Sequence, residues 1–204
     1  GTAPYTFIYN IDGGANQTIV SSGNVATLTR SSATAGRFVY NLVSVQDASS
    51  TNCSNVQTGT ATVTVNALPT ATITGTTTVC QNAGDQTITF TGAGGTAPYT
   101  FTYNIDGGAN QTIVSIGNVA TLTRSSATAG NFIYNLVSVQ DASSTNCSNV
   151  QTGTATIIVN PLPTATITGT TTVCQNAGDQ TITFTGAGGT APYTFIYNID
   201  GGAN

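Results

Sequence analysis

Four cysteines are the residues of this 204-residue chain whose chemistry is easiest to define. They are Cys53, Cys80, Cys147 and Cys174, and each of the first two recurs 94 positions later. Cysteines form disulfides, bind zinc or act as nucleophiles. The chain has no His, and no second Cys lies near enough in sequence to complete a zinc site. Two cysteines per repeat, in a chain whose composition suggests export, favour disulfides over metal binding or catalysis.

Acid–base catalysis lacks the residues that it needs. The chain contains seven Asp and three Arg, but no Glu, Lys or His. Proton transfer at neutral pH is most often performed by His, Glu, Asp or Lys in a tuned environment. Ser and Thr are abundant, yet none has an activating partner that the sequence reveals. We therefore expect no enzyme activity, no catalytic residue and no cofactor.

Aspartates that recur once per repeat are the other candidates for a site. Asp85, Asp106 and Asp141 are such residues, but no Asp-x-Asp or Asp-x-Asn run of the kind found in calcium loops is present. We expect these aspartates to form turns and no metal site to exist. Calcium held between domains by dispersed loops stays open as an alternative.

The remaining candidate functional residues are one arginine and a row of three aromatic residues. Arg124, whose counterpart is Arg30, is expected to pack its stem on a sheet or to meet a nearby Asp rather than to bind an anion. Tyr99, Phe101 and Tyr103 alternate along one segment, which predicts one face of a strand. A core role is favoured over an aromatic surface for sugars.

Composition indicates an all-β protein. Thr, Gly, Ala, Asn, Val, Ser and Ile are the commonest residues, whereas charged residues make up 5% of the chain and Lys, Glu and Met are absent. β-Branched residues and turn formers favour strands over helices. The net charge of −4 argues against nucleic acid as a partner. No apolar run approaches the ~20 residues of a membrane span, and the weakly charged, Thr-rich surface is typical of a secreted protein.

A 94-residue repeat organises the chain. The sequence GTAPYTF occurs at residues 1–7, 95–101 and 189–195, and the first two copies of the repeat differ at seven positions. A period of this length is a whole domain rather than a solenoid unit. Proline-containing segments at 66–69 and 160–163 indicate the boundaries, because proline stiffens a connection. We expect the rear part of one repeat, one complete repeat and the front part of a third, in residues 1–67, 68–161 and 162–204.

Alternating apolar and polar residues predict the strands of the complete repeat. The segment 75–85 is expected to be a polar connection, and Asp106-Gly107 a hairpin turn because both residues tolerate positive φ. The expected strands cover residues 70–74, 86–91, 99–105, 111–115, 119–123, 129–141 and 154–159.

The segment 129–141 is expected to be the central strand. It is the densest apolar segment, with Tyr134 near its start, and we expect a bulge near Leu136-Val137. We place Val139 on the face opposite Tyr134. A tyrosine at this place resembles the tyrosine corner of immunoglobulin-like sandwiches, and about seven strands in 94 residues match that fold in size. The expected core comprises Tyr40, Tyr134, Phe132, Leu136, Phe90, Ile88, Phe101 and Tyr103.

Three segments carry a resemblance to a known family. They are PTATITGTTTVCQN at 163–176, GGTAPYTF at 94–101 and YNLVSVQDASS at 134–144. The chain resembles the tandem repeats of giant Bacteroidetes cell-surface proteins, most closely the SprB-like gliding-motility adhesins exported by type IX secretion. The GTAPY element also resembles a loop of PKD domains.

The resemblance implies a long extracellular filament or stalk at the cell surface, with a role in adhesion and gliding. Its partners would be neighbouring repeats, lateral copies in a filament, and a surface polysaccharide or substratum. A repeated polysaccharide-binding module that acts through multivalency is the alternative. A passive spacer of a secreted enzyme is a third interpretation.

The pairing of the cysteines stays open. In immunoglobulin-like strand order, Cys80 and Cys147 lie in loops at opposite ends of the sandwich, beyond the ~7 Å between Cα atoms that a disulfide spans. A bond between domains, from Cys80 to a cysteine after residue 204, is slightly favoured. The alternative is that the segment 75–85 folds back far enough for a Cys80–Cys147 bond.

Overall fold

The expectation of an all-β chain is confirmed. A computed structural model describes residues 1–202, and strands joined by turns make up all regular structure in that range. No helix capable of spanning a membrane occurs within it. The chain divides into two compact units. Unit 1 comprises residues 1–69 with 94–96 and 142–147, and unit 2 comprises 70–93, 97–141 and 148–204.

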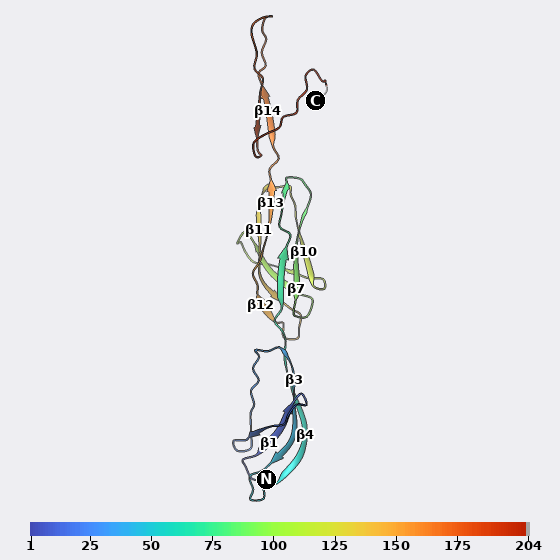
Figure 1. The fold of residues 1–204 in the computed structure, drawn as a ribbon, viewed down its shortest axis with the longest axis vertical. Helices are drawn as coiled ribbons and strands as arrows, with labels where there is room; N and C mark the ends of the chain where they lie inside the picture. Colours follow the sequence, from blue (N-terminus) through green and yellow to red (C-terminus); the bar gives the residue numbers. More distant parts are fainter. Residues whose placement is uncertain (203–204) are drawn as a thin grey trace. The chain divides into compact units, whose positions relative to one another are not determined.

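Two facing sheets form a β-sandwich from residues 70–160, called the middle sandwich below. In Figure 1, β7 and β10 belong to one sheet, and β11 and β13 to the other. All strand pairs are antiparallel except β6 with β13. The first sheet has the order β10 (Val119–Arg124), β7 (Gln86–Ala93), β5 (Thr70–Thr74). The second has the order β6 (Thr77–Cys80), β13 (Thr154–Asn160), β11 (Gly130–Gln140), β8 (Thr100–Ile105), β9 (Gln111–Val114), with β12 (Ser148–Val150) also beside β11.

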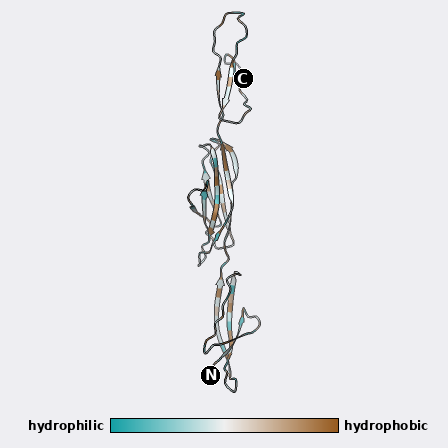
Figure 2. Ribbon diagram, turned by 90° about the vertical axis from the view of Figure 1, so that its left-hand side faces the viewer, coloured by the Kyte–Doolittle hydropathy of each residue, from teal (hydrophilic) through white to brown (hydrophobic). Residues whose placement is uncertain are grey.

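The core lies between these two sheets. Along β7, β8 and β13, buried apolar residues alternate with more exposed ones. Figure 2 shows the corresponding bands of hydrophobic and hydrophilic residues along the strands. The Phe90 ring lies 5.6 Å from the Phe101 ring and 5.1 Å from the Tyr103 ring, measured between centroids. The buried apolar residues are Ala71, Ile73, Ile88, Phe90, Tyr99, Phe101, Tyr103, Ala120, Tyr134, Leu136, Val139, Ala155, Ile157 and Val159.

A bulge in β11 re-aims its later side chains. The pairing of β11 with β8 shifts register between Leu136 and Ser138, where the sequence predicts a bulge. One extra residue reverses the alternation of faces. As a result Val139 is buried with Tyr134 and Leu136, so the placement of Val139 on the opposite face was wrong.

Strand β6 was missed in the sequence. Residues 77–80 were expected to belong to a polar connection, but they pair in parallel with β13. The four residues Thr-Thr-Val-Cys show little alternation of apolar and polar side chains, so they carry no strand pattern. Because the pair with β13 is parallel, no hairpin turn sequence lies next to it to reveal the strand. The remaining expected strands of the middle sandwich are present within two residues of their expected ends.

The first 65 residues form a single four-stranded sheet in unit 1, called the N-terminal sheet. Most residues of its first and third strands are half-buried rather than buried. Its order is β2 (Gln17–Val20), β1 (Thr6–Ile11), β3 (Gly36–Gln46), β4 (Ser54–Val65).

The last part of unit 2 contains one antiparallel pair, called the C-terminal pair. It joins β14 (Thr164–Thr168) to β15 (Thr183–Ala187). Both strands are largely exposed, and Phe184 is half-buried. Residues 203 and 204, at the end of the expected third repeat, lie outside the described residues.

Candidate functional site

The four cysteines are all free thiols in this structure. Cys80 ends β6, opposite Asn160 at the end of β13. Cys147 directly precedes Ser148, which pairs with Gln140 at the end of β11. The two cysteines of the middle repeat therefore belong to different ends of the same sheet.

The length of strand β11 gives the approximate distance between Cys80 and Cys147. Its first residue, Gly130, pairs with Val159 near Cys80, and its last residue, Gln140, pairs with Ser148 next to Cys147. Ten residue steps along a strand correspond to roughly 33 Å. A disulfide requires Cα atoms within about 7 Å. The fold therefore opposes a Cys80–Cys147 bond within one sandwich.

The recurring aspartates support turns and strand ends. Asp106 has a φ of 54°, and its Oδ1 accepts a hydrogen bond from the Ile133 amide at 2.8 Å. Asp141 is buried at the end of β11. At the equivalent position in unit 1, Asp47 accepts bonds from the Ser49 hydroxyl at 2.7 Å and the Thr2 amide at 3.2 Å. The hydrogen bond from Ser49 lowers the pKa of the Asp47 carboxyl below its usual value.

No metal centre is evident from these carboxylates. Within residues 1–202, no group of three or more Cys, Asp, Glu or His side chains gathers where it could hold an ion. Calcium between domains therefore stays the alternative that the sequence leaves open.

Arg124 packs on an aromatic ring. Its guanidinium carbon lies 3.5 Å from the centroid of Phe132, and Arg30 lies 3.4 Å from the centroid of Phe38 in unit 1. The Nε of Arg124 is buried and has no hydrogen-bond partner among the described residues. Burial raises the pKa of the neighbouring Tyr134 phenol, and the charge of Arg124 partly opposes that rise. Arg124 thus connects β10 of one sheet to β11 of the other through its contact with Phe132.

The aromatic row lies inside the protein. Tyr99, Phe101 and Tyr103 are all buried in the middle sandwich, as are Ile88, Phe90 and Leu136 of the expected core. Phe132 and Tyr40 are half-buried. In this position the three rings offer no stacking surface for a sugar.

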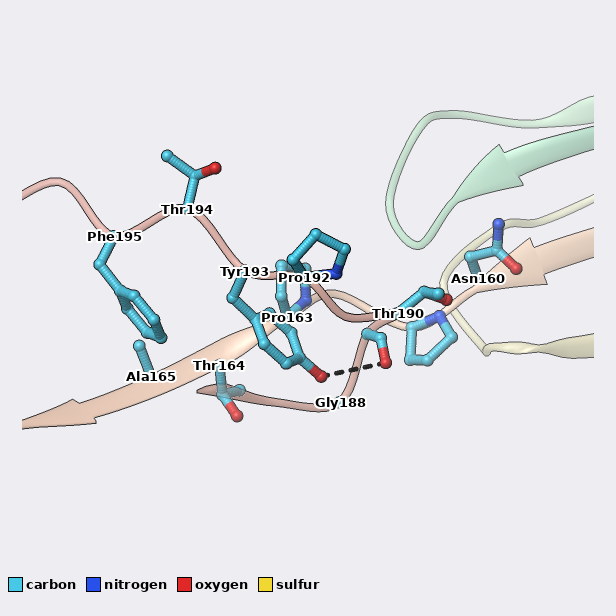
Figure 3. A pocket seen from close by; sticks show the side chains of 12 residues that line it. Asn160, Pro163, Thr164, Ala165, Gly188, Thr190, Pro192, Tyr193, Thr194 and Phe195 are labelled. Carbon is cyan, nitrogen blue, oxygen red and sulfur yellow. Dashed lines mark hydrogen bonds between the residues drawn. The ribbon is translucent and has the colours of Figure 1, made fainter. Parts of the chain in front are cut away.

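Figure 3 shows a hollow beside the C-terminal pair, lined by the proline segment around Pro163 and by the loop that carries Tyr193 and Phe195. The Tyr193 hydroxyl donates a hydrogen bond to the Gly189 carbonyl at 3.1 Å. Tyr99 and Phe101, the counterparts of its two aromatic residues, are buried in the middle sandwich. Two of the residues that line the hollow are thus copies of residues that belong to the core of the middle sandwich.

A second hollow lies on the N-terminal sheet, within unit 1. It is lined mainly by apolar side chains, including Phe7, Tyr40 and Leu42. Their counterparts Phe101, Tyr134 and Leu136 form the core of the middle sandwich. This hollow too is lined by copies of core residues.

The parallel pair of β6 and β13 joins the two ends of the middle repeat. Thr77 is opposite Ile157, and Cys80 is opposite Asn160. Two further bonds extend the pair: the Gln81 amide donates to the Asn160 carbonyl at 2.8 Å, and the Thr156 amide donates to Thr76 Oγ1 at 3.1 Å.

One side-chain bond and one backbone bond anchor the same segment to the β10–β11 connection. Gln81 Nε2 donates to the Ala127 carbonyl at 2.7 Å, and the Asn82 amide donates to the Ser126 carbonyl at 3.0 Å. Sequence reasoning missed this group because it lies in the segment taken for a loop. Residues 76–82 recur unchanged at 170–176, which marks the segment as part of the repeat but not as a strand.

Comparison with models of protein families and with curated proteins finds no match. Among solved structures, the chain is similar to one described as a "Ca2+-stabilized adhesin" that "helps an Antarctic bacterium reach out and bind ice", with 17% sequence identity and a TM-score of 0.36. The match covers 81% of this chain and 43% of that chain, so this chain spans less than half of the matched structure.

Proposed function

We propose that each 94-residue repeat is a load-bearing domain of a long extracellular adhesin stalk. The observation that carries this proposal is the parallel pairing of β6, near the start of the middle repeat, with β13, its last strand. The fold supports a mechanical role through the direction in which these two strands leave the sandwich.

Tension on the two ends of the repeat would shear this pair. The N-terminal side of β6 and the C-terminal side of β13 point in opposite directions, because the strands run parallel. A pull along the chain therefore loads the hydrogen bonds from Thr76 to Gln81 together, whereas an antiparallel hairpin pulled at its ends would open one bond at a time. Each such bond contributes on the order of 1 kcal/mol net, and breaking several at once raises the barrier.

The assignment of the repeat to a particular kind of adhesin domain rests on the sequence. The resemblance to SprB-like repeats supports an immunoglobulin-like or PKD-like domain in a cell-surface adhesin that functions in adhesion and gliding. Repeat boundaries at 67/68 and 161/162 fit the start of β5 and the end of β13. Neighbouring repeats, lateral copies in a filament, and a polysaccharide or substratum would be the partners.

Disulfides between neighbouring repeats would strengthen such a stalk. Because a bond within one sandwich would have to span roughly 33 Å, Cys80 would bond the equivalent of Cys147 in the following repeat. We expect non-reducing peptide mapping of two repeats joined in tandem to yield that crosslink. A peptide pair that joins Cys80 to Cys147 of the same repeat would contradict this proposal.

The mechanical role is tested by pulling on tandem copies of residues 68–161 with and without Gln81→Pro. Proline removes the amide that donates to Asn160, and the unfolding force should fall. Gln81→Ala is the matched control, since it removes only the side-chain bond to Ala127 and should leave most of the force intact. Equal forces for the proline variant and the wild type would contradict the role of this pair.

A polysaccharide-binding module is the less supported alternative, because its candidate aromatic row is buried. Selective binding of residues 68–161 on a glycan array would favour that module over the load-bearing domain or a passive spacer.

A further inference from the structure

One outer face of the middle sandwich is covered by threonine. In the sheet formed by β5, β7 and β10, every second residue points away from the core. Three such threonines lie on β5 within 70–74, three on β7 within 87–91 and two on β10 within 121–123, and together they are called the threonine face below. Thr89 lies at its centre, opposite Thr74 of β5 on one side and Thr121 of β10 on the other.

The threonine face carries no charge. The charged residues of the middle repeat are Asp85, Asp106, Arg124 and Asp141. The three aspartates lie outside β5, β7 and β10, and Arg124 points inward, where it stacks on Phe132. Protein surfaces usually mix charges that keep copies apart, and exposed strands often carry Lys for this purpose. The threonine face therefore has no charge that would repel an identical face.

Most hydroxyls of the threonine face are free to bind a partner. Thr70 Oγ1 donates to the Ala93 carbonyl at 3.4 Å, and within residues 1–202 the other hydroxyls of the face form no hydrogen bond. The outer face of the second sheet differs, because its Asn135 side chain donates to Asn104 Oδ1 at 2.9 Å. A hydroxyl both donates and accepts a hydrogen bond. Two threonine faces are therefore complementary to each other.

The threonine face also keeps its sequence from repeat to repeat. Each of its three strand segments recurs unchanged 94 residues earlier or later in the chain. The outer face of the second sheet does not, because Thr102 and Ile158 stand where the first copy has Ile8 and Thr64. An array of repeats therefore presents the same threonine face once in every 94 residues.

We propose that the threonine face binds the same face of a second copy of this protein, so that arrays of repeats associate side by side. Such a contact is isologous, and Thr89 at the centre of one face lies against its counterpart in the second copy. Nucleic acid or an anionic membrane would require basic residues, which the face lacks. The inference rests on the proposed function for the tandem array of repeats, but not for its resistance to force.

A single threonine face is too small to hold two domains together. Three strands ~4.8 Å apart, with five residues at ~3.4 Å each, make a face of roughly 14 Å by 17 Å, or about 240 Å². A stable interface buries about 800 Å² on each partner. One repeat should therefore stay monomeric, whereas an array multiplies the contact. A second array is favoured over a neutral polysaccharide because its faces recur at the same interval.

Sedimentation velocity on arrays of one, two, four and eight copies of residues 68–161, in reductant so that disulfides do not form, tests the proposal. The concentration at which half of the arrays associate should fall by about 100-fold or more from two copies to eight. Thr89→Lys or Thr89→Asp in every copy should abolish association, because like charges then face each other. An equimolar mixture of these two variants should associate again, which also shows that both are folded. Thr102→Lys is the matched control, since it adds the same charge at a half-buried threonine of the second sheet and should associate like the wild type.

Wild-type arrays of eight copies that stay monomeric would overturn the proposal, even if they bind an immobilised neutral glucan, because the partner of the face would then be a polysaccharide. It is equally overturned if Thr89→Lys associates like the wild type, if Thr102→Lys abolishes association too, or if the mixed variants stay apart. The unfolding force of a single array reports the mechanical role separately. Thr89→Lys should leave that force unchanged, so the lateral contact can fail while the load-bearing role holds.

Discussion

At the scale of single residues, the sandwich depends on close contacts that allow little change. Gly92 is the clearest case, because a Cβ built on it would lie 2.5 Å from Cγ of the buried Tyr99 ring. The same contact recurs between Gly186 and Tyr193. A glycine in strand β7 thus makes room for the ring of Tyr99, which directly precedes β8 of the facing sheet.

Replacing Gly92 by Ala should destabilise residues 68–161 by about 1–3 kcal/mol, the usual cost of overpacking a core. Urea denaturation measures the change. Thr91→Ala is the control, since Thr91 is exposed on the same strand and should change stability by less than about 1 kcal/mol. A Gly92→Ala variant as stable as the control would show that Tyr99 moves aside freely.

The stacking of Arg124 on Phe132 should contribute about 1 kcal/mol, in the range of a partly desolvated cation–π pair. A double-mutant cycle with Arg124→Gln and Phe132→Leu isolates that coupling from the loss of packing. If the effects of the two substitutions on the free energy of unfolding are additive, the charge of Arg124 contributes nothing to stability beyond ordinary packing against Phe132.

Tyr134 should make the sandwich sensitive to alkaline pH. Burial raises the pKa of its phenol in the folded protein above the ordinary value of 10.0. The contribution to stability is fully present below the unfolded pKa and is lost as pH rises through the higher folded pKa. Denaturation of residues 68–161 with and without Tyr134→Phe should diverge above about pH 10. Parallel curves would contradict this.

At the scale of elements, alternation in the sequence predicts the long strands but not all of their neighbours. Ile88 and Phe90 in one strand, and Phe101 and Tyr103 in another, alternate with Thr, and these strands form as expected. Strand β6 shows almost no alternation, because it needs only to pair with the edge of β13. The bulge near Leu136 was predictable from the sequence. Its effect on Val139 was not, because the exact position of the register shift depends on the pairing with strand β8.

Residues 25–30 and 119–124 show how far context overrides local preference. The two segments are identical in sequence, yet only the second, paired with β7, is a strand. Propensity alone is therefore too weak to form this strand. The candidate force-bearing pair was unpredictable for the same reason, since one of its strands exists only through its partner.

At the scale of the whole molecule, the 94-residue repeat places the same sequence in different structural settings. The middle repeat has all the strands that enclose its core, whereas the N-terminal sheet and the C-terminal pair each have part of that set. Because the repeats are nearly identical, a segment of one repeat fits the corresponding place in its neighbour. The same identity creates a risk of swapping between neighbours during folding.

The load-bearing role of the repeat can be measured by force–extension of a tandem array of residues 68–161. Unfolding 94 residues releases about 300 Å of chain, taking up to ~3.6 Å per extended residue and a folded length of ~40 Å. The account predicts one force peak per repeat, evenly spaced at about 300 Å. An array that extends without peaks, or whose spacing does not match a 94-residue unit, would contradict it.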